Sequence, residues 1–354
     1  MWHGARDSPP QRPPQGADGA FAPASPGAFA PASSRIDAIM AEPTAADGIH
    51  VVDTHYVQPL FDAAHLIVQD GRAAFVDCGT AHAVPRLLAA LEAQGLTADS
   101  VDWLLLTHVH LDHAGGAGQL LQALPRARVA VHPRGAPHLI DPRKLIDASI
   151  AVYGEENYRR LYGDLLPIDA ARVEATPDGA RLALGDRAIE VLHTPGHALH
   201  HQAYLDHRAQ VIFTGDTFGV AYGALAVDGH PFSVPTTSPT QFDPEQLSAS
   251  IERVVASGAR TACLTHYGPI GELPRVGEDL VRMVRRFTDT ALAHAARPAA
   301  EARAAIRDGL RAVVLEEWRR LGATAPESLL DAWAGFDFDL NADGLMAWLA
   351  RRAR

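Results

Sequence analysis

The sequence predicts a mixed α/β fold followed by an all-helical C-terminal region, and three observations support this prediction. Short β-rich runs bounded by turn residues recur between residues 49 and 266. Helical patterns of apolar residues lie between several of these runs. Residues 276–354 contain no strand-like run, yet they carry three of the five tryptophans of the chain. A disordered tail would rarely carry them, so we expect this region to pack as helices.

Residues 1–48 are rich in Pro, Gly, Ala and Ser and contain no apolar segment typical of a secretory signal. Such a composition cannot bury enough apolar surface to offset the entropy of ordering, so we expect a disordered leader. Met40 lies near the end of this stretch, and a natural start at Met40 is a hypothesis.

The main domain is predicted to span residues 49–275. It opens with three β-rich runs, and a helix follows whose apolar residues share one face before Gly95 ends it. The next predicted strand is VDWLLLTH, followed by a helix near residues 116–124 and the strand RVAVHP. In chain order, the ranges of the first three runs and of their helix are 49–56, 64–70, 72–79 and 81–95.

The second half of this domain begins after a helical insertion, predicted over residues 136–170. A helix from Pro244 to Ser257 precedes the last strand, RTACLTH, which ends at His266. Four further strands lie between the insertion and that helix, near residues 181–184, 188–193, 202–205 and 210–214.

The composition of the chain limits the kinds of partner that we expect it to bind. The formal net charge of −11 argues against a nucleic-acid backbone, because phosphate binding needs positive surface charge. No apolar run approaches the roughly 18 residues of a membrane span. The only two cysteines, Cys78 and Cys263, make no disulfide framework, which favours a cytoplasmic protein. We expect a small-molecule substrate and neither nucleic acid nor membrane as partner; a homo-oligomer stays open.

The string Thr-His-Val-His-Leu-Asp-His-Ala-Gly-Gly, at residues 107–116, directly follows an apolar strand and contains four potential metal ligands. Alternate residues of a strand point to the same side, so His108 and His110 can hold one ion together. Asp112 and His113 lie where the chain turns into a helix and can face a second position. We expect Gly115 and Gly116 to permit a tight turn there.

Three more β-rich runs lead to a potential ligand: His197 after EVLHTPG, Asp216 in VIFTGD and His266 in ACLTH. Ligands at strand ends can converge on one edge of a sheet, where active sites commonly lie. Imidazole together with carboxylate suits zinc, and also iron or manganese.

The chain resembles the metallo-β-lactamase superfamily over about residues 50–270. Five landmarks carry the resemblance: Asp77 in FVDCGT, the H-x-H-x-D-H block, His197 in TPGH, Asp216 in FTGDT and His266 in THYGP. The resemblance implies a four-layer αββα sandwich, classed as α/β (α+β), with metals at one edge and a helical C-terminal extension.

The resemblance also implies roles for these residues. His108, His110 and His197 would bind the first metal ion, and Asp112, His113 and His266 the second. Asp216 would bridge the two ions. Asp77 would orient the ligand loop, and His201 is a further candidate for such support.

The two implied metal ions predict the mechanism of the reaction. Two divalent ions about 3.5–4 Å apart share a water molecule and lower its pKa toward 7, so that hydroxide attacks the substrate. Asp112 and Asp216 are therefore the candidate catalytic residues, and Asp112 is a candidate proton carrier to the leaving group. The expected activity is hydrolysis of a small ester, thioester or lactone. Candidate pocket residues are the six tyrosines Tyr56, Tyr153, Tyr158, Tyr162, Tyr222 and Tyr267.

Branches of this superfamily differ in residues near the block. TPGH with His201 and FTGDT look like the hydroxyacylglutathione hydrolases (glyoxalase II), but FGVAYGAL after Asp216 lacks their lysine-bearing turn. The lactonases carry a tyrosine three residues after the bridging aspartate, where this chain has Gly219. Neither cysteine matches the metal-binding cysteine of class B β-lactamases, and the charge argues against ribonuclease Z.

Two other interpretations of the function stay open. Persulfide dioxygenases resemble this fold and use a single iron, which His108, His197 and Asp216 would hold here. The fold could also serve as a non-catalytic binding module. Loss of one or two ligands is the usual sign of such a module, and this chain has the full set.

Overall fold

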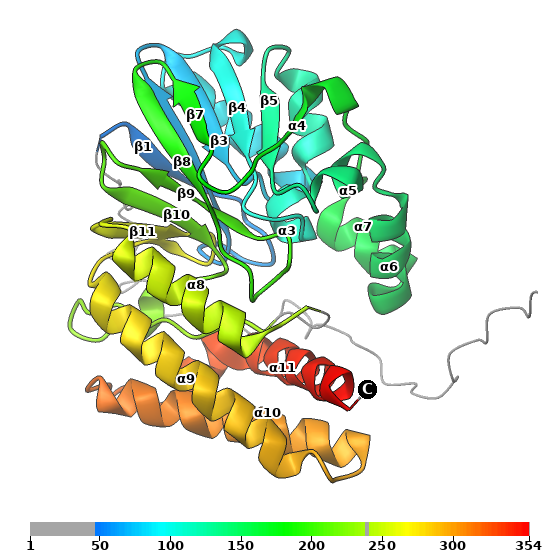
Figure 1. The fold of residues 1–354 in the computed structure, drawn as a ribbon, viewed down its shortest axis with the longest axis vertical. Coiled ribbons are helices and arrows are strands. Elements are labelled where there is room, and N and C mark those ends of the chain that lie inside the picture. The colour runs from blue at the N-terminus through cyan, green and yellow to red at the C-terminus, as the bar shows by residue number, and fades with distance from the viewer. Residues whose placement is uncertain (1–46, 238–240, 354) are drawn as a thin grey trace, which may run out of the picture.

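The computed structural model describes residues 47–237 and 241–353, and two β-sheets pack face to face between outer layers of helices (Figure 1). The predicted α/β class, the four-layer sandwich and the helical C-terminal region are thus confirmed. The predicted leader lies almost wholly outside the described residues. Among the described residues, no helix is both long and apolar enough to cross a membrane.

The first sheet has strand order β1-β2-β3-β4-β5-β6 in the described part of the chain. Strands β1 to β3 pair antiparallel, whereas β3 to β6 pair parallel. The bounds are β1 Ile49–Asp53, β2 Ala63–Gln69, β3 Arg72–Val76, β4 Val101–Leu105, β5 Arg128–Val131 and β6 Val173–Ala175.

The second sheet has strand order β12-β11-β10-β9-β8-β7 over the same described ranges. Its pairs are antiparallel except for β10 with β11, which run parallel. The bounds are β7 Arg181–Leu184, β8 Arg187–His193, β9 Gln202–Asp206, β10 Val211–Gly215, β11 Thr261–Leu264 and β12 Gly268–Ile270.

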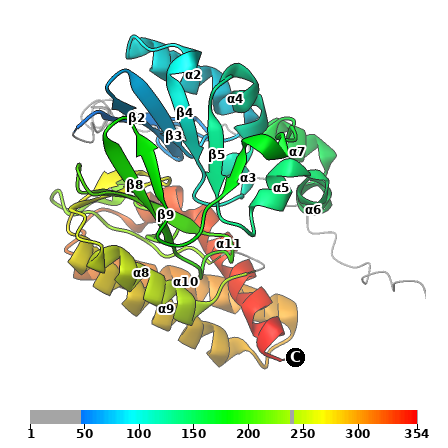
Figure 2. The ribbon, with the colours of Figure 1, turned by 45° about the horizontal axis from the view of Figure 1, so that its top comes forward.

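Helices cover both outer faces (Figure 2). The α-helices are α2 Val84–Ala93, α3 Leu111–Ala114, α4 Ala117–Ala123, α5 Ala136–Ile140, α6 Arg143–Tyr153, α7 Glu155–Tyr162, α8 Pro244–Ala256, α9 Leu273–His294, α10 Ala299–Arg320 and α11 Glu327–Arg352. Short 3₁₀ helices are η1 Ala81–Ala83, η2 Ala98–Ser100, η3 Ala170–Arg172 and η4 Gly223–Leu225.

Apolar residues on both faces of the strands explain the layers. Along β2, Leu66 packs into the core under α2 and α4, while its neighbour Ile67 packs into the core between the two sheets. Along β3, Phe75 and Val76 divide in the same way. Since successive side chains point to opposite faces, a strand covered on both sides must read as a continuous apolar run.

Two edge strands were not predicted from the sequence. Strands β6 and β12 have only three residues each, and β12 reads Gly-Pro-Ile. Such short runs carry no period-two signal, and their pairing depends on the neighbouring strand. The strand predicted to end at His266 ends at Leu264, which leaves His266 in the following turn.

The C-terminal helices extend the layer of α8 on the second sheet. Helix α9 packs between α8 and α10, and α11 crosses back toward η4 and the sheet edge. Trp318 and Trp348 are buried in one core with Phe287 of α9 and Phe242. The division at residue 276 remains a prediction, and α9 itself begins at Leu273.

Candidate metal centre

All seven candidate ligands lie together at one edge of the sandwich. His108 and His110 directly follow β4, and Asp112 and His113 lie on α3. The other three, His197, Asp216 and His266, follow β8, β10 and β11 of the second sheet. Their donor atoms form three overlapping groups, and within each group the atoms lie within 4.8 Å of one another: His108/His110/His197, His108/His113/Asp216 and Asp112/His113/His266.

Three imidazoles make the first group. His110 Nδ1 lies 2.8 Å from His108 Nε2 and 3.1 Å from His197 Nε2. The same His197 nitrogen lies 3.4 Å from Asp216 Oδ2. Burial, together with the neighbouring histidines, lowers the pKa of His108 well below its usual value and the pKa of His110 to about 3. The rings are therefore neutral and can offer lone pairs to a cation.

The group of Asp112, His113 and His266 has a different charge balance from the three imidazoles. Asp112 Oδ2 lies 3.5 Å from His266 Nε2 and 3.9 Å from His113 Nε2. Burial lowers the pKa of His266, but Asp216, Asp112 and Asp62 outweigh it and raise the value to about 10. For His113, burial again opposes and the carboxylates raise the pKa. The carboxylates around these histidines attract positive charge. A bound divalent cation would supply that charge in place of protons on the two rings.

Asp216 lies between the two groups. Its Oδ2 faces His197, whereas its Oδ1 lies 3.2 Å from His113 Nε2 and 3.7 Å from His266 Nε2. Neither Asp216 Oδ1 nor His113 Nε2 has a hydrogen-bond partner, although both are buried. Buried polar atoms rarely stay without a partner, so these two atoms fit a site in which a cation lies between them.

In four of the candidate ligands, a hydrogen bond at Nδ1 of the histidine ring fixes the ring so that Nε2 faces the other donor atoms. Three of these histidines are His113, His266 and His197. The Nδ1–H of His113 donates to Asp77 Oδ2 at 2.8 Å, and that of His266 donates to the Phe61 carbonyl at 3.0 Å. Thr236 donates its hydroxyl proton to the Asp216 carbonyl, so it accepts from His197 Nδ1 at 2.9 Å. Each of these rings must then present an unprotonated Nε2 when neutral.

The ring of His108 is fixed in the same way, by a hydrogen bond to a threonine. The Thr107 hydroxyl donates to Asp77, so its oxygen accepts from His108 Nδ1 at 3.1 Å. His110 is the exception, because its Nδ1 is the atom that faces His108 and His197. Nitrogen and oxygen donors in this arrangement fit zinc, iron or manganese.

Asp77 connects several ligand segments. One carboxylate oxygen accepts from the Thr107 backbone N–H at 2.8 Å. The other accepts from His113 Nδ1 and from the Thr265 hydroxyl at 2.9 Å. The aspartate therefore holds the segment before His108, the ring of His113 and the segment before His266, and its orienting role toward a bound metal stays a prediction.

His201 holds the backbone of Asp216. Its Nε2 accepts from the Asp216 backbone N–H at 3.2 Å, and its Nδ1 bonds Thr194 Oγ1 at 2.8 Å. Gly215 makes this approach feasible: a Cβ there would lie 2.7 Å from His201 Nε2, and its φ of +48° is unfavourable for other residues.

The glycine pair after His113 has a different reason from the one predicted. Gly115 and Gly116 have φ values of −61° and −83°, which any residue adopts, so no special turn requires them. A Cβ on Gly116 would lie 2.7 Å from the Thr80 carbonyl oxygen. The missing side chain permits close packing against the segment that follows Asp77.

Five of the six candidate tyrosines divide into two places. Tyr222 and Tyr267 line a pocket beside the turn that carries His266. Tyr56 donates to the Tyr162 hydroxyl at 3.1 Å, and Tyr158 and Tyr162 are buried around Leu111, next to Asp112. These three do not line that pocket, and the side chain of Tyr153 lies outside the described residues.

Some residues of the site were missed by sequence reasoning. Thr107 and Thr265 both bond Asp77 and both precede a ligand histidine, so the repeated Thr-His pair was a usable signal. Trp333 and Asp337 reach Tyr222 from the C-terminal helix α11. No local pattern could have found them, because they lie more than a hundred residues from Tyr222 in the sequence.

Comparisons with known proteins identify relatives of this chain. Residues 58–266 match the family model described as the metallo-beta-lactamase superfamily. A hydroxyacylglutathione hydrolase of Xanthomonas euvesicatoria is 32% identical over 252 residues, which cover 68% of this chain and 76% of the relative.

Two solved structures share the fold. An archaeal metallo-beta-lactamase superfamily protein from Sulfolobus tokodaii has a TM-score of 0.55 and 25% identity, covering 68% of this chain and 87% of that one. A metallo-beta-lactamase family protein from Thermus thermophilus has a TM-score of 0.59 and 23% identity, covering 86% and 94%.

Proposed function

The chain belongs to the metallo-β-lactamase superfamily and is a metallo-hydrolase; from this premise we propose that it holds two divalent cations and hydrolyses a small ester, thioester or lactone. His108, His110 and His197 would hold one cation, and Asp112, His113 and His266 the other. The position of Asp216 carries the proposal, because its two carboxylate oxygens face different donor groups.

When bound, the cations would supply an activated water molecule and stabilise the negative charge that develops on the substrate oxygen. In the hydrolysis, the water oxygen forms a bond to the acyl carbon, the C–O or C–S bond breaks, and the leaving group takes a proton. Asp112 can carry that proton, since its side chain is 25% exposed while His113 and His266 are buried. Asp77, Thr236 and Phe61 hold the ligand rings in place.

We propose zinc as the cation and a small molecule as the only substrate partner, with the cytoplasm as location. The relative from Xanthomonas is named for a glutathione thioester, which makes a thioester one candidate class. The segment after Asp216 contains no lysine, so glutathione itself is not the substrate that we favour.

A substrate panel tests this proposal. The chelated protein is reloaded with zinc and assayed on an aryl ester, an acyl thioester, S-lactoylglutathione and a lactone. We expect zinc-dependent turnover of at least one class. His110→Ala should abolish it, while His207→Ala, which removes a half-exposed histidine far from the centre, should leave it unchanged. Equal turnover with and without metal would refute the proposal, as would no turnover of any class by the loaded protein.

A further inference from the structure

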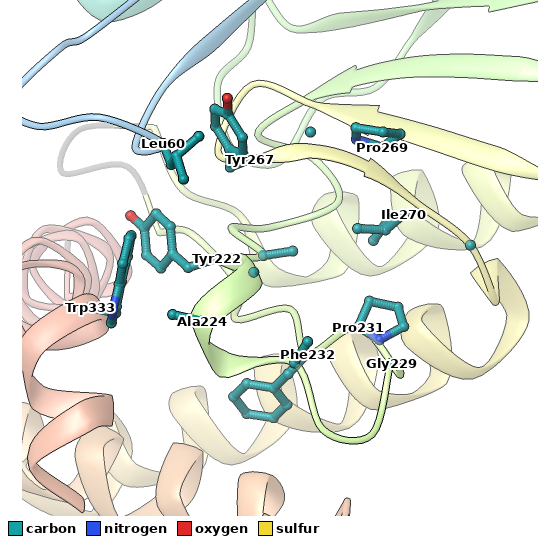
Figure 3. Close-up of a pocket in the computed structure, with 15 residues that line it drawn as sticks. Leu60, Tyr222, Ala224, Gly229, Pro231, Phe232, Tyr267, Pro269, Ile270 and Trp333 are labelled. Atoms are coloured by element: carbon teal, nitrogen blue, oxygen red, sulfur yellow. The ribbon is translucent and has the colours of Figure 1, made fainter. Parts of the chain in front are cut away.

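A pocket of about 280 Å³ lies beside the turn that carries His266, since Tyr267, the next residue in the chain, forms part of its wall (Figure 3). Leu60 and Tyr267 lie on one side of it and Phe232 on the opposite side, with Tyr222 and Trp333 between them along the flank formed by α11. The volume is close to the lower end of the range of roughly 300–1,000 Å³ that is typical of small-ligand sites.

The walls of this pocket are continuous with the segments that carry the metal ligands. Tyr267 directly follows His266, and the Ala221 backbone N–H donates to the His266 carbonyl at 2.5 Å. The Phe61 ring lies 5.9 Å from the His266 ring and 5.3 Å from the Tyr222 ring, centre to centre. One aromatic ring therefore separates the pocket wall from a metal ligand.

Helix α11 completes the pocket. Trp333 packs on Tyr222 with ring centres 5.5 Å apart, and Asp337, one turn later, accepts from the Tyr222 hydroxyl at 3.2 Å. Burial, and then the nearby Asp337 carboxylate, raises the pKa of Tyr222. The tyrosine is thus a neutral, fixed wall, and its hydroxyl is already engaged by Asp337.

The lining has no charge. Its fifteen residues, all among those described, include neither Asp, Glu, Lys, Arg nor His. A glutathione group would bring carboxylates and an ammonium group that this surface cannot pair, and leaving charges unpaired there would be costly. An aliphatic chain loses no hydrogen bond in such a pocket and gains apolar contact.

We propose that this pocket binds the aliphatic acyl chain of a neutral ester or thioester, with Trp333 and Ala224 setting the chain length. The inference rests on the proposed hydrolase function and narrows its substrate class. The acyl carbon would lie at the metal centre and the chain would extend past Phe61 into the pocket.

An acyl-chain series on the zinc-loaded protein tests the inference. For thioesters from acetyl to octanoyl with one leaving group, kcat/KM should increase by about fourfold per buried methylene until the pocket is full. A thioester with a carboxylate at the end of a six-carbon chain should react at least tenfold more slowly than hexanoyl.

Two variants change the pocket in opposite directions. Ala224→Leu fills part of it, so the preferred chain should become shorter, and the ratio of hexanoyl to acetyl kcat/KM should fall by about tenfold. Trp333→Ala removes one wall, so the optimum should move to longer chains. Opposite shifts cannot both result from partial unfolding.

Matched controls lie outside the pocket. Phe336→Ala removes an aromatic side chain that is 46% exposed on the same helix, and Ala93→Leu enlarges an exposed alanine of α2. Both should keep the wild-type chain-length profile. A flat profile for the wild type, or profiles of the pocket variants equal to those of the controls, would overturn the inference.

A binding measurement separates this inference from the hydrolase proposal. Calorimetry with the straight-chain carboxylates from acetate to octanoate needs no turnover. Affinity that increases with chain length in the wild type and falls in Ala224→Leu would support the pocket even if every ester proved inert, a result that would refute only the proposed reaction. Affinity independent of chain length would refute the pocket.

Discussion

Asp77 forms hydrogen bonds with three of the segments that carry candidate metal ligands. Its carboxylate accepts from the Thr107 backbone, from Thr265 and from His113 Nδ1. Asp77→Asn would turn an N–H group toward these donors and release the His113 ring. We expect metal affinity to fall by about 10- to 100-fold, which is typical for the loss of such an orienting contact. Competition with a chromophoric chelator measures it.

The matched control for this variant is Asp289→Asn, an exposed aspartate on α9 far from the centre. It should bind metal as the wild type does. Unchanged affinity in Asp77→Asn would show that Asp77 serves folding alone.

Asp112 is the residue where metal binding and proton transfer can be separated. In Asp112→Asn one oxygen donor remains near His266, but the amide cannot take up a proton. If Asp112 carries the proton, kcat should fall by about 10²- to 10⁴-fold with little change in metal content. Turnover at the wild-type rate would contradict that role, and a parallel loss of metal would assign Asp112 to binding only.

Sequence patterns predicted which candidate ligands lie together, but not the residues that hold their rings. The seven candidate ligands are residue types placed after apolar strands, and the structure brings all seven together. Thr236 and Phe61, which fix two of the histidines, carry no such signal, since the contacts use a hydroxyl and a backbone carbonyl from distant loops. Contacts of that kind depend on how the loops fold.

At the scale of elements, long amphipathic or wholly apolar segments were predictable. The buried run predicted near residues 210–214 is β10, and the helix predicted from Pro244 is α8. The edge strands β6 and β12 were missed because three residues cannot show a period. The position of α11 against Tyr222 was also beyond the sequence, because helix packing depends on tertiary contacts.

Glu317 joins helices α9 and α10. The side chain is 4% exposed and accepts from Arg282, Arg286 and Arg320. Burial raises its pKa, but these arginines outweigh burial and lower it to about 2, from 4.5. Glu317→Gln should therefore reduce the free energy of unfolding by about 2 kcal/mol at neutral pH.

The pH dependence of this effect has a definite sign. A carboxylate whose pKa is lowered on folding stabilises the fold above pH 4.5 and loses that contribution as pH falls toward 2. The difference between wild type and Glu317→Gln in urea unfolding should thus shrink over that window. Glu316→Gln, with a side chain that is 69% exposed, should have little effect at any pH. A constant difference down to pH 2 would contradict the ion-pair account.

At the scale of the whole molecule, the candidate metal centre lies where the two sheets meet. Four candidate ligands follow β4 of the first sheet, and three follow β8, β10 and β11 of the second. Cations bound there would stabilise the folded state by mass action, by about 4 kcal/mol when free metal exceeds the dissociation constant a thousandfold. Chelation should lower the melting temperature by on the order of 10 °C.

Thermal unfolding before and after chelation measures this effect. Added zinc should restore the original midpoint, whereas magnesium, which prefers oxygen ligands, should not. A midpoint insensitive to chelation that has demonstrably removed the metal would show that the centre does not hold the sheets together.

The metal-to-protein ratio of the purified protein, measured by elemental analysis, tests the central claim most directly. The two donor groups that share Asp216 predict about two divalent ions per chain, with zinc the main metal. His110→Ala should lower the ratio, and His207→Ala should not. A single iron per chain that takes up no second metal would contradict the two-metal hydrolase and point to an oxygen-dependent reaction instead.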